Sequence, residues 1–374
     1  MQKPDVTPLK THEQLEDFLE QWGVREYRPG DEIQMNELFN KIFNENRSLD
    51  YWYWKYTDTP WFKDKVMALR EVDGKIFGQF CNVGVKFKVK DSEYVFAQTV
   101  ENCVDFDHWG KGIIKSLYCG VLGVGYFYKI NLAMGFPNEM YYPIVTSIFN
   151  SVDLVSLPVF FCRTTWRSAV EKRFSSAFLS DLISGISRLL IRLQLFFKKP
   201  ILKKNLRIEV SKDFDDDFTL LWKSLAPSLA ICGIRDREYL EWRYKRNPLA
   251  IFHVLKCSDE QMMVGYAVLA VEESKSGHRI GHIMDIFCYD SERVIGCIVK
   301  AALRFFLRNH ADYVKCGVLE HAPQHKVLRK YGFSFRGEKK PFVLQEVDPA
   351  FPHYGFFETA QNWYLTLGDT DFLG

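Results

Sequence analysis

The segments YWYWKYTDTP (51–60) and YLEWRYKRNP (239–248) share the pattern Y-x-x-W-[K/R]-Y-x-x-x-P, although they lie in different halves of the chain. The segments that follow the two copies also show the same order of predicted elements. Two strand-like alternating stretches meet at a polar turn, Asp73-Gly74 in the first half and 258–260 in the second, and a third strand-like stretch comes next. Asp-Gly between two such stretches is a strong hairpin signal. A shared motif followed by the same order of strands predicts a duplicated domain.

Each half then continues as helix, strand, helix. In the first half we expect a helix over 112–126, a strand over 129–136 and a helix over 139–150. In the second half, 291–309 reads as a helix, 311–319 as a strand, and 322–335 as a helix followed by a strand. Antiparallel strands followed by a strand–helix–strand crossover predict an α+β fold with two tandem domains. Each domain would be a twisted, mainly antiparallel sheet flanked by helices.

The segment between the halves, 166–205, has a different composition. Its apolar residues recur at three- and four-residue steps, which predicts an amphipathic helix. Nine Lys/Arg against Glu171 and Asp181 give 9 − 2 = +7, so the rest of the chain carries about 2 − 7 = −5. We therefore expect domains at 1–165 and 206–374 joined by this basic helix. The helix either packs its apolar face across both domains or makes peripheral contact with an anionic membrane surface.

Composition indicates a folded protein without a strong charge bias. Hydrophobic residues make up 47% and charged residues 26% of the 374 residues, and the net charge of +2 gives no argument for nucleic acid. The N-terminal residues lack the apolar core of a secretory signal, and no stretch has the roughly 18 apolar residues of a membrane span. We expect a cytoplasmic protein, with the inner face of the membrane as an alternative location.

Cysteine and histidine spacing gives no sign of a metal. The nine cysteines include no C-x-x-C pair, and the nine histidines include no H-x-H or H-E-x-x-H. We expect reduced thiols that mostly fill the core, and no metal cofactor.

A second stretch, DHWGKGIIKSL (107–117), suggests a ligand. It lies where a strand over 97–106 gives way to the helix that begins near Gly112. Glycine at 110 and 112 permits positive φ and close approach of a ligand, and the free N–H groups of a helix start favour a pyrophosphate. The stretch lacks the G-x-x-x-x-G-K-[S/T] of a Walker loop. It also lacks the third glycine of a Rossmann loop and comes after several antiparallel strands, which is the wrong place for that fold.

This loop resembles the acyl-CoA loop of the GNAT superfamily of N-acyltransferases, [Q/R]-x-x-G-x-[G/A]. Both glycines match, whereas Asp107 replaces the usual Gln or Arg. The chain as a whole resembles bacterial tandem GNAT proteins, and GFPN (135–138) and WYLTLGDTD (363–371) are similar to members associated with surface-polysaccharide biosynthesis. The resemblance implies acetyl-CoA as co-substrate and a small amine as acceptor, with a nucleotide-linked amino sugar as the leading candidate. It implies these CoA-binding residues: Val104, Phe106, His108, Trp109, Gly110, Lys111, Gly112, Ile113 and Asn138.

Only the first half has this loop. At the corresponding place the second half reads FCYDSERVIGCIV (287–299), where Gly296 stands alone and Glu292 and Arg293 bring charged side chains. We therefore expect one active site per chain, in the first half, and a second half that shapes the cleft or stabilises the first.

The resemblance also implies the chemistry, which is direct attack of the amine on the thioester. Glu101 lies on the strand beside the expected thioester and is a candidate base, on one face with Cys103 and Asp105 by two-residue alternation. The tyrosine that often protonates the thiolate is missing from its usual place near Val145. Tyr141 or Tyr142 could replace it, and Tyr141 is our candidate. Asn138 could cap the last helix of the first half or bind the pantetheine arm.

Two other functions fit the same features. One is a Fem-like transferase that uses aminoacyl-tRNA, which would explain the duplication but usually lacks a G-x-G loop. The other is a non-catalytic acyl-CoA-binding scaffold, which the uncertain acid and base would favour.

Overall fold

The structure is a computed structural model. It describes residues 3–165 except Pro8, and 206–371 except Gln261 and 352–353; of the connecting segment it describes only 183, 185–187, 189–191 and 193. These connecting positions are helical, and Ile186, Leu189, Leu190 and Leu193 are exposed. The remainder of the predicted linker helix lies outside the described residues.

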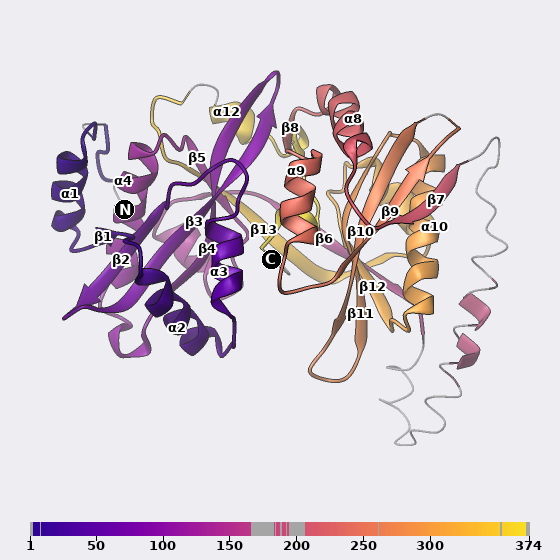
Figure 1. The fold of residues 1–374 in the computed structure, drawn as a ribbon, viewed down its shortest axis with the longest axis horizontal. Coiled ribbons are helices and arrows are strands. Elements are labelled where there is room, and N and C mark those ends of the chain that lie inside the picture. Colours follow the sequence, from indigo (N-terminus) through magenta and orange to yellow (C-terminus); the bar gives the residue numbers. More distant parts are fainter. Residues whose placement is uncertain are drawn as a thin grey trace.

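The first half begins with helices and the short strand β1, and its strands and helices then follow in the order that the sequence predicts (Figure 1). Its elements are α1 (His12–Gln21), β1 (Arg25–Glu26), α2 (Asp31–Phe43), α3 (Leu49–Tyr56), β2 (Met67–Val72), β3 (Lys75–Val89), β4 (Ser92–Val104), η1 (Phe106–His108), α4 (Ile113–Phe127), β5 (Leu132–Gly135), α5 (Tyr142–Ser147) and β6 (Val152–Arg163). The first copy of the repeated motif forms α3.

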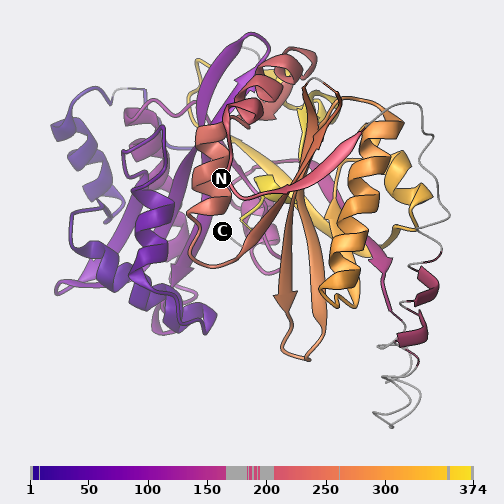
Figure 2. The ribbon, with the colours of Figure 1, turned by 45° about the vertical axis from the view of Figure 1, so that its right-hand side comes forward.

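The second half repeats this order and ends in an added tail. Its elements are β7 (Arg207–Ser211), α8 (Asp216–Leu225), η2 (Ala226–Ser228), β8 (Ile231–Gly233), α9 (Arg237–Leu240), η3 (Glu241–Lys245), β9 (Phe252–Ser258), β10 (Met263–Glu273), β11 (Arg279–Cys288), α10 (Glu292–Arg308), β12 (Tyr313–Gly317), α11 (Pro323–Lys330), β13 (Ser334–Glu346), α12 (Tyr354–Phe357), η4 (Ala360–Asn362), β14 (Trp363–Tyr364) and η5 (Leu367–Asp369). In Figure 2, α10 lies along the sheet formed by β9 and β10.

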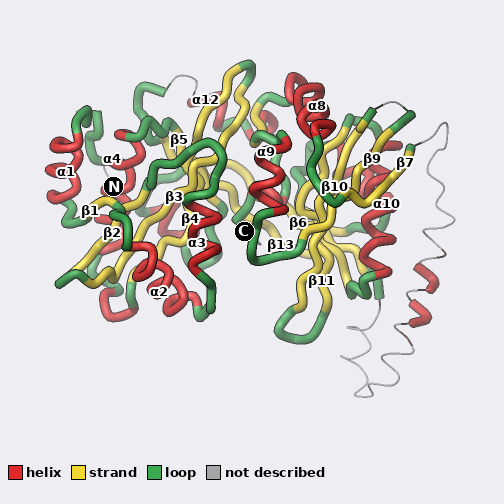
Figure 3. Tube along the Cα trace, in the orientation of Figure 1, coloured by secondary structure: helices red, strands yellow, loops and turns green. Residues whose placement is uncertain are grey.

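The sheets of the two halves join into one. In the described part of the chain, the strands run in the order β1-β2-β3-β4-β5-β13-β6-β12-β11-β10-β9-β7, and β8 and β14 pair beside this path. β13 lies between β5 and β6, antiparallel to both, and β6 continues the sheet to β12. Strands from both halves of the chain therefore meet in the middle of the molecule (Figures 1 and 3).

The matched tryptophans of the repeat meet between the halves. The rings of Trp54 and Trp242 stack with centroids 5.4 Å apart. The Nε1–H of Trp54 donates to the carbonyl of Trp242 at 2.7 Å, and the Nε1–H of Trp242 donates to the carbonyl of Trp54 at 2.9 Å. Because each partner makes the same bond to the other, the two halves are related by a local two-fold arrangement at this point.

Two apolar layers cover the sheet of the first half. On one face α1, α4 and α5 bury a cluster that includes Phe80 and Leu117, and on the other α2 and α3 contribute to a core that continues into the second half. The predicted α+β fold with two tandem, mainly antiparallel domains is confirmed. The sequence reading missed β6, which comes after α5 and links the two sheets.

Two further expectations can be compared with the structure. All nine cysteines are free thiols, and seven of them are buried. Among the described residues, no helix is long and apolar enough to cross a bilayer.

Candidate active site

A β-bulge in β4 creates the site. Val100 is opposite Cys81 and Cys103 is opposite Gln79, so Glu101 and Asn102 together face the single residue Phe80 of β3. Glu101 has a φ of +56°, which is rare and strained for a residue with a side chain. A bulge bends its strand and interrupts the hydrogen-bond ladder. Cys103 and Asp105 share the α2–α3 face with Glu101 as predicted, but the bulge also brings Val100 to that face.

The bend opens the sheet beside β4. β4 and β5 pair in parallel only at Ala97–Ala133 and Gln98–Met134, and then diverge. A cavity of about 1030 Å³ passes through the opening. On one side of the sheet it is lined by α4 and α5, and on the other by α2, the loop before α3 and the C-terminal Asp371. A ligand entering from the α4 side therefore has access to a second ligand on the α2 side.

The glycine loop forms one mouth of this cavity. Gly110 and Gly112 have φ of +74° and +73°, and Gly112 is the N-cap of α4 without a side-chain cap. A Cβ added at either glycine would meet no atom within 4 Å. Both glycines are thus required by their backbone conformation, and both face open space rather than packed protein. A helix start exposed in this way suits the negative charge of a pyrophosphate.

The other predicted CoA-binding residues surround this mouth. Val104, His108, Trp109, Ile113 and Asn138 line the cavity with the two glycines, whereas Phe106 and Lys111 do not. The Nε1–H of Trp109 donates to the carbonyl of Val104 at 2.7 Å, which leaves the ring half exposed over the loop. His108 stacks on Phe77 with centroids 4.0 Å apart.

Lys111 and Phe106 have local partners instead. The Lys111 ammonium donates to the carbonyl of Asp107 at 2.9 Å, and the Phe106 ring contacts Trp109 with centroids 5.0 Å apart. Both therefore support the shape of the loop. Neither forms part of the cavity wall.

Tyr141 and Asn138 lie on the α5 side. The Asn138 side-chain oxygen accepts from the backbone N–H of Tyr141 at 2.9 Å in the turn before α5, whereas the N-cap of α5 itself is Tyr141, without a side-chain cap. The Tyr141 hydroxyl oxygen accepts from the Asn102 amide at 3.1 Å. Burial raises the pKa of Tyr141, so its hydroxyl stays protonated at neutral pH. Tyr141 therefore lines the cavity with its hydroxyl in the neutral form.

Glu101 lies in a buried charge cluster. Its carboxylate pairs with Arg47 Nη1 at 2.5 Å and with Lys55 Nζ at 2.8 Å, and it accepts from the Tyr56 hydroxyl at 2.9 Å. Burial by itself would raise the pKa of Glu101, but Lys55 and Arg47 outweigh burial and lower it. A carboxylate stabilised as the anion in this way is a weak proton acceptor.

Asp371 is the carboxylate that sequence reasoning missed. Its Oδ1 lies 2.5 Å from Lys55 Nζ, and both Asp371 and Glu101 line the cavity, but the side chain of Asp371 is 39% exposed and that of Glu101 only 3%. Desolvation by the surrounding residues and the nearby Glu101 carboxylate raise the pKa of Asp371, and Lys55 only partly opposes this shift. Lys55 thus joins a buried carboxylate to a more exposed one at the same cavity. The only signal in the sequence was the acidic end of GDTD (368–371), since Asp371 and Glu101 belong to opposite halves of the chain.

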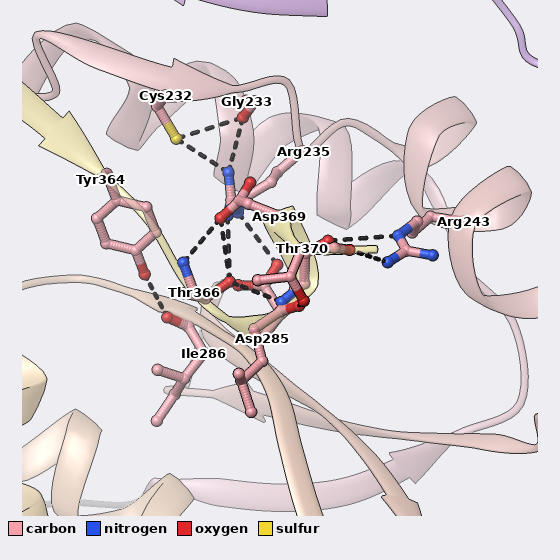
Figure 4. Close-up of polar contacts among 12 residues, drawn as sticks. Cys232, Gly233, Arg235, Arg243, Asp285, Ile286, Tyr364, Thr366, Asp369 and Thr370 are labelled. Carbon is pink, nitrogen blue, oxygen red and sulfur yellow. Dashed lines mark hydrogen bonds and ion pairs between the residues drawn. The ribbon is translucent and has the colours of Figure 1, made fainter. Parts of the chain in front are cut away.

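Side chains of the second half hold the C-terminal segment that leads to Asp371, here called the tail; Figure 4 shows their contacts with Thr366, Asp369 and Thr370. The buried Arg235 guanidinium contacts Asp285 at 3.1 Å and Asp369 at 2.6 Å. Arg243, the counterpart of Lys55, donates to the carbonyl of Thr370 at 2.8 Å. Arg235 is likewise the counterpart of Arg47, because both precede the repeated motif by the same spacing. Corresponding cations therefore bind Glu101 in one half and the tail in the other.

The helix start of the second half differs from that of the first. Eight residues (105–112) connect β4 to α4, but only three (289–291) connect β11 to α10. Glu292 at the start of α10 pairs with Lys326 at 2.9 Å and also with Lys330. A carboxylate with two ammonium partners thus occupies the position where the first half has its open glycine turn.

Comparison with known proteins identifies the fold. No protein-family profile matches the chain, and no curated protein matches it. Among solved structures, it is similar to a GCN5-related N-acetyltransferase from Anabaena variabilis ATCC 29413 (TM-score 0.61, 12% identity, 87% of this chain and 72% of that chain). It is also similar to a conserved protein of unknown function and probable N-acyltransferase from Enterococcus faecalis V583 (0.58, 11%, 87% and 72%). A third is Eis1 from Mycobacterium abscessus (0.54, 13%, 87% and 73%). At these identities the likeness establishes the GNAT fold over most of the chain.

Proposed function

We propose that the protein is an N-acyltransferase that uses acetyl-CoA or a related acyl-CoA and has one active site, in its first half. The observation that carries the proposal is the continuous cavity from the open glycine turn to the Glu101 bulge. Pyrophosphate at Gly110–Gly112 and a thioester beside the bulge would place the pyrophosphate and the reactive end of one CoA molecule at the two features that the fold provides. The likeness to solved N-acetyltransferases supports the same activity.

In the proposed reaction the acceptor amine enters from the α2 side and attacks the thioester carbonyl. The C–N bond forms, the C–S bond breaks, and the amine loses a proton. We assign that proton to Asp371, directly or through a water, because Asp371 is the more exposed of the two carboxylates at the cavity and its pKa is raised, whereas that of Glu101 is lowered. Glu101, the base expected from sequence, would hold Lys55 in place and keep the local charge balanced.

Tyr141 would complete the reaction by protonating the CoA thiolate. Its oxygen already accepts a hydrogen bond from Asn102, so its own proton is oriented elsewhere. Arg47 lines the cavity, and its buried Nη2 has no hydrogen-bond partner among the described residues, so a polar group of the acceptor would satisfy it. The positive charges of Arg47 and Lys55 equal the negative charges of Glu101 and Asp371 in number, so the cluster has no net charge. Such a site suits an acceptor that has polar groups besides its amine.

For the acceptor we propose an amino sugar linked to a nucleotide, acetylated for surface polysaccharide. The support is the resemblance of the sequence and the aromatic residues around the α2 side of the cavity, Phe39, Phe43 and Tyr51. We also propose the domain limits 1–165, 166–205 and 206–374, a cytoplasmic location, and peripheral membrane contact through 166–205. The exposed apolar residues of the connecting helix support that contact.

Titration calorimetry with acetyl-CoA, followed by an assay of thiol release, tests the proposal. We expect a stoichiometry near one per chain, and turnover with one member of a panel of nucleotide-linked amino sugars, lysine peptides and polyamines. A stoichiometry near two would show that the second half also binds CoA. Binding without turnover on any amine would identify a scaffold, and stabilisation by aminoacyl-tRNA but not by acetyl-CoA would identify a Fem-like transferase.

A further inference from the structure

The cavity continues beyond the place where an acetyl group would end. Its wall includes Val121, Leu122 and Gly125 near the C-terminal end of α4, together with Ile130 and Val347. From Gly112 to Gly125 the helix advances about 20 Å, at 1.5 Å per residue. Because α4 is followed directly by β5, its C-terminal end lies near the start of β5, where β4 and β5 pair at Ala97–Ala133. The cavity therefore extends behind the closed part of the sheet.

This inner part is apolar. Its lining side chains belong to the buried cluster between the sheet and α4, and most of them expose less than a tenth of their surface. Closely packed interiors rarely leave space of this kind, because each unfilled volume loses dispersion contacts. An apolar cavity is poor at holding water, which needs two to four polar partners. The chemistry of the wall suits a hydrocarbon chain.

The position of the inner part relative to the bulge indicates which part of a ligand would bind there. Glu101 lies in the bulge, where the proposed function places the thioester, and Ala97 precedes it by four residues, about 13 Å back along β4 at 3.3 Å per residue. A chain attached to the thioester carbonyl would enter the inner part directly, on the side away from the acceptor. At about 1030 Å³ the whole cavity is at the upper end of the roughly 300–1,000 Å³ typical of ligand sites.

We propose that the inner part of the cavity binds the hydrocarbon chain of the acyl donor, and that the preferred donor is a medium-chain acyl-CoA of about octanoyl length rather than acetyl-CoA. This inference rests on the proposed N-acyltransferase function. The inference specifies the length of the acyl group, which neither the G-x-G loop nor the proposed catalytic residues determine. The chain stays in the apolar layer behind the sheet, and the polar cluster of Glu101, Lys55 and Asp371 stays on the acceptor side.

A donor series of acetyl-, butyryl-, hexanoyl-, octanoyl- and palmitoyl-CoA tests the inference with the full-length chain. Each buried methylene is worth about 0.8 kcal/mol, so we expect affinity to rise about fourfold per methylene until the cavity is filled. The heat-capacity change of binding should become more negative along the same series. Affinity that is flat or falls from acetyl- to octanoyl-CoA would overturn the inference and leave the acetyltransferase proposal intact. Absence of binding by every acyl-CoA would overturn the proposed function itself.

Gly125 gives a variant that narrows the inner part. A Cβ added there would lie 3.4 Å from Val347 Cγ1 and 3.6 Å from Val66 Cγ1, in ordinary contact, so Gly125→Ala is tolerated and Gly125→Leu extends a larger side chain at the same place. We expect the ratio of octanoyl-CoA to acetyl-CoA affinity to fall in the order wild type, Gly125→Ala, Gly125→Leu, by about tenfold or more at the last step. Gly277→Ala, in a turn of the second half, should leave the ratio unchanged. An unchanged ratio in folded Gly125→Leu would contradict the proposed subsite.

Discussion

Replacing Gly112 with aspartate is expected to abolish acyl-CoA binding while the chain still folds. Gly112 is the N-cap of α4, and a side chain there would meet no atom within 4 Å. The aspartate therefore fits without a steric clash, and its carboxylate occupies the place proposed for the pyrophosphate. Most substitutions of a buried glycine disturb the packing around it. Gly112→Asp instead adds a negative charge at the proposed pyrophosphate site.

Two contributions set the size of the effect. A residue other than glycine at φ of +73° costs about 1–2 kcal/mol of folding stability. Two unit charges about 4 Å apart at a protein surface repel by about 4 kcal/mol, which is close to a thousandfold in the dissociation constant. Salt and rearrangement of the loop reduce this value, so we expect a loss of at least about a hundredfold.

The chain offers matched controls for both contributions. Gly277 has a φ of +76° and also meets no atom within 4 Å, so Gly277→Asp has the same backbone strain and charge at a turn in the second half. Gly112→Asn keeps the size of the side chain and removes its charge, and asparagine tolerates this conformation best among the larger residues. Titration calorimetry gives the affinity for acetyl-CoA, and thermal unfolding gives the stability of each variant.

The expected order of affinity is wild type and Gly277→Asp, then Gly112→Asn, then Gly112→Asp. If folded Gly112→Asp binds acetyl-CoA within about threefold of wild type, the loop does not hold the pyrophosphate. If Gly112→Asn and Gly112→Asp lose affinity equally, strain rather than charge is responsible, and the argument from the helix start is wrong.

Three further predictions concern the charge cluster and the contact between the halves. Glu101→Gln leaves Arg47 and Lys55 with one counter-charge fewer in a buried site, and should lower the free energy of unfolding in urea by about 3–5 kcal/mol. Because the folded pKa of Glu101 is lowered, this contribution is present above the unfolded pKa and is lost as pH falls through the folded value, so the difference between variant and wild type should shrink in acid. Asp371→Asn should lower kcat with little change in acetyl-CoA affinity. In the wild type, kcat should fall on the acid side at a pH above the ordinary aspartate pKa, because the pKa of Asp371 is raised. A variant with the same kcat as the wild type would return the role of base to Glu101. Trp54→Ala should destabilise the chain by about 3–5 kcal/mol, since it removes both the stacked ring and a buried bond to Trp242, and a loss below about 1 kcal/mol would show that the halves are held together elsewhere.

The sequence by itself determined the repeated architecture and the position of the glycine loop. Both depend on local information. The Y-x-x-W motif and the alternation after it recur along the chain, and Asp-Gly or G-x-G specifies a backbone conformation within a few residues. For that reason the predicted strands and helices of both halves were found in the structure, and Gly110 and Gly112 have the predicted positive φ. The functional roles of Glu101, Tyr141 and the loop residues stay predictions.

The tertiary structure decided what surrounds the loop. Alternation along β4 predicted which residues share a face with Glu101, but not the bulge, because a bulge is a property of two paired strands and not of one sequence. β13 inserts between β5 and β6, which requires strands from opposite halves of the chain to match in register. Asp371 reaches Lys55 only because Arg235 and Arg243 of the second half hold the tail. Local patterns fix the backbone of each segment, whereas the partners of a buried charge and the shape of a cavity depend on segments that only folding brings together.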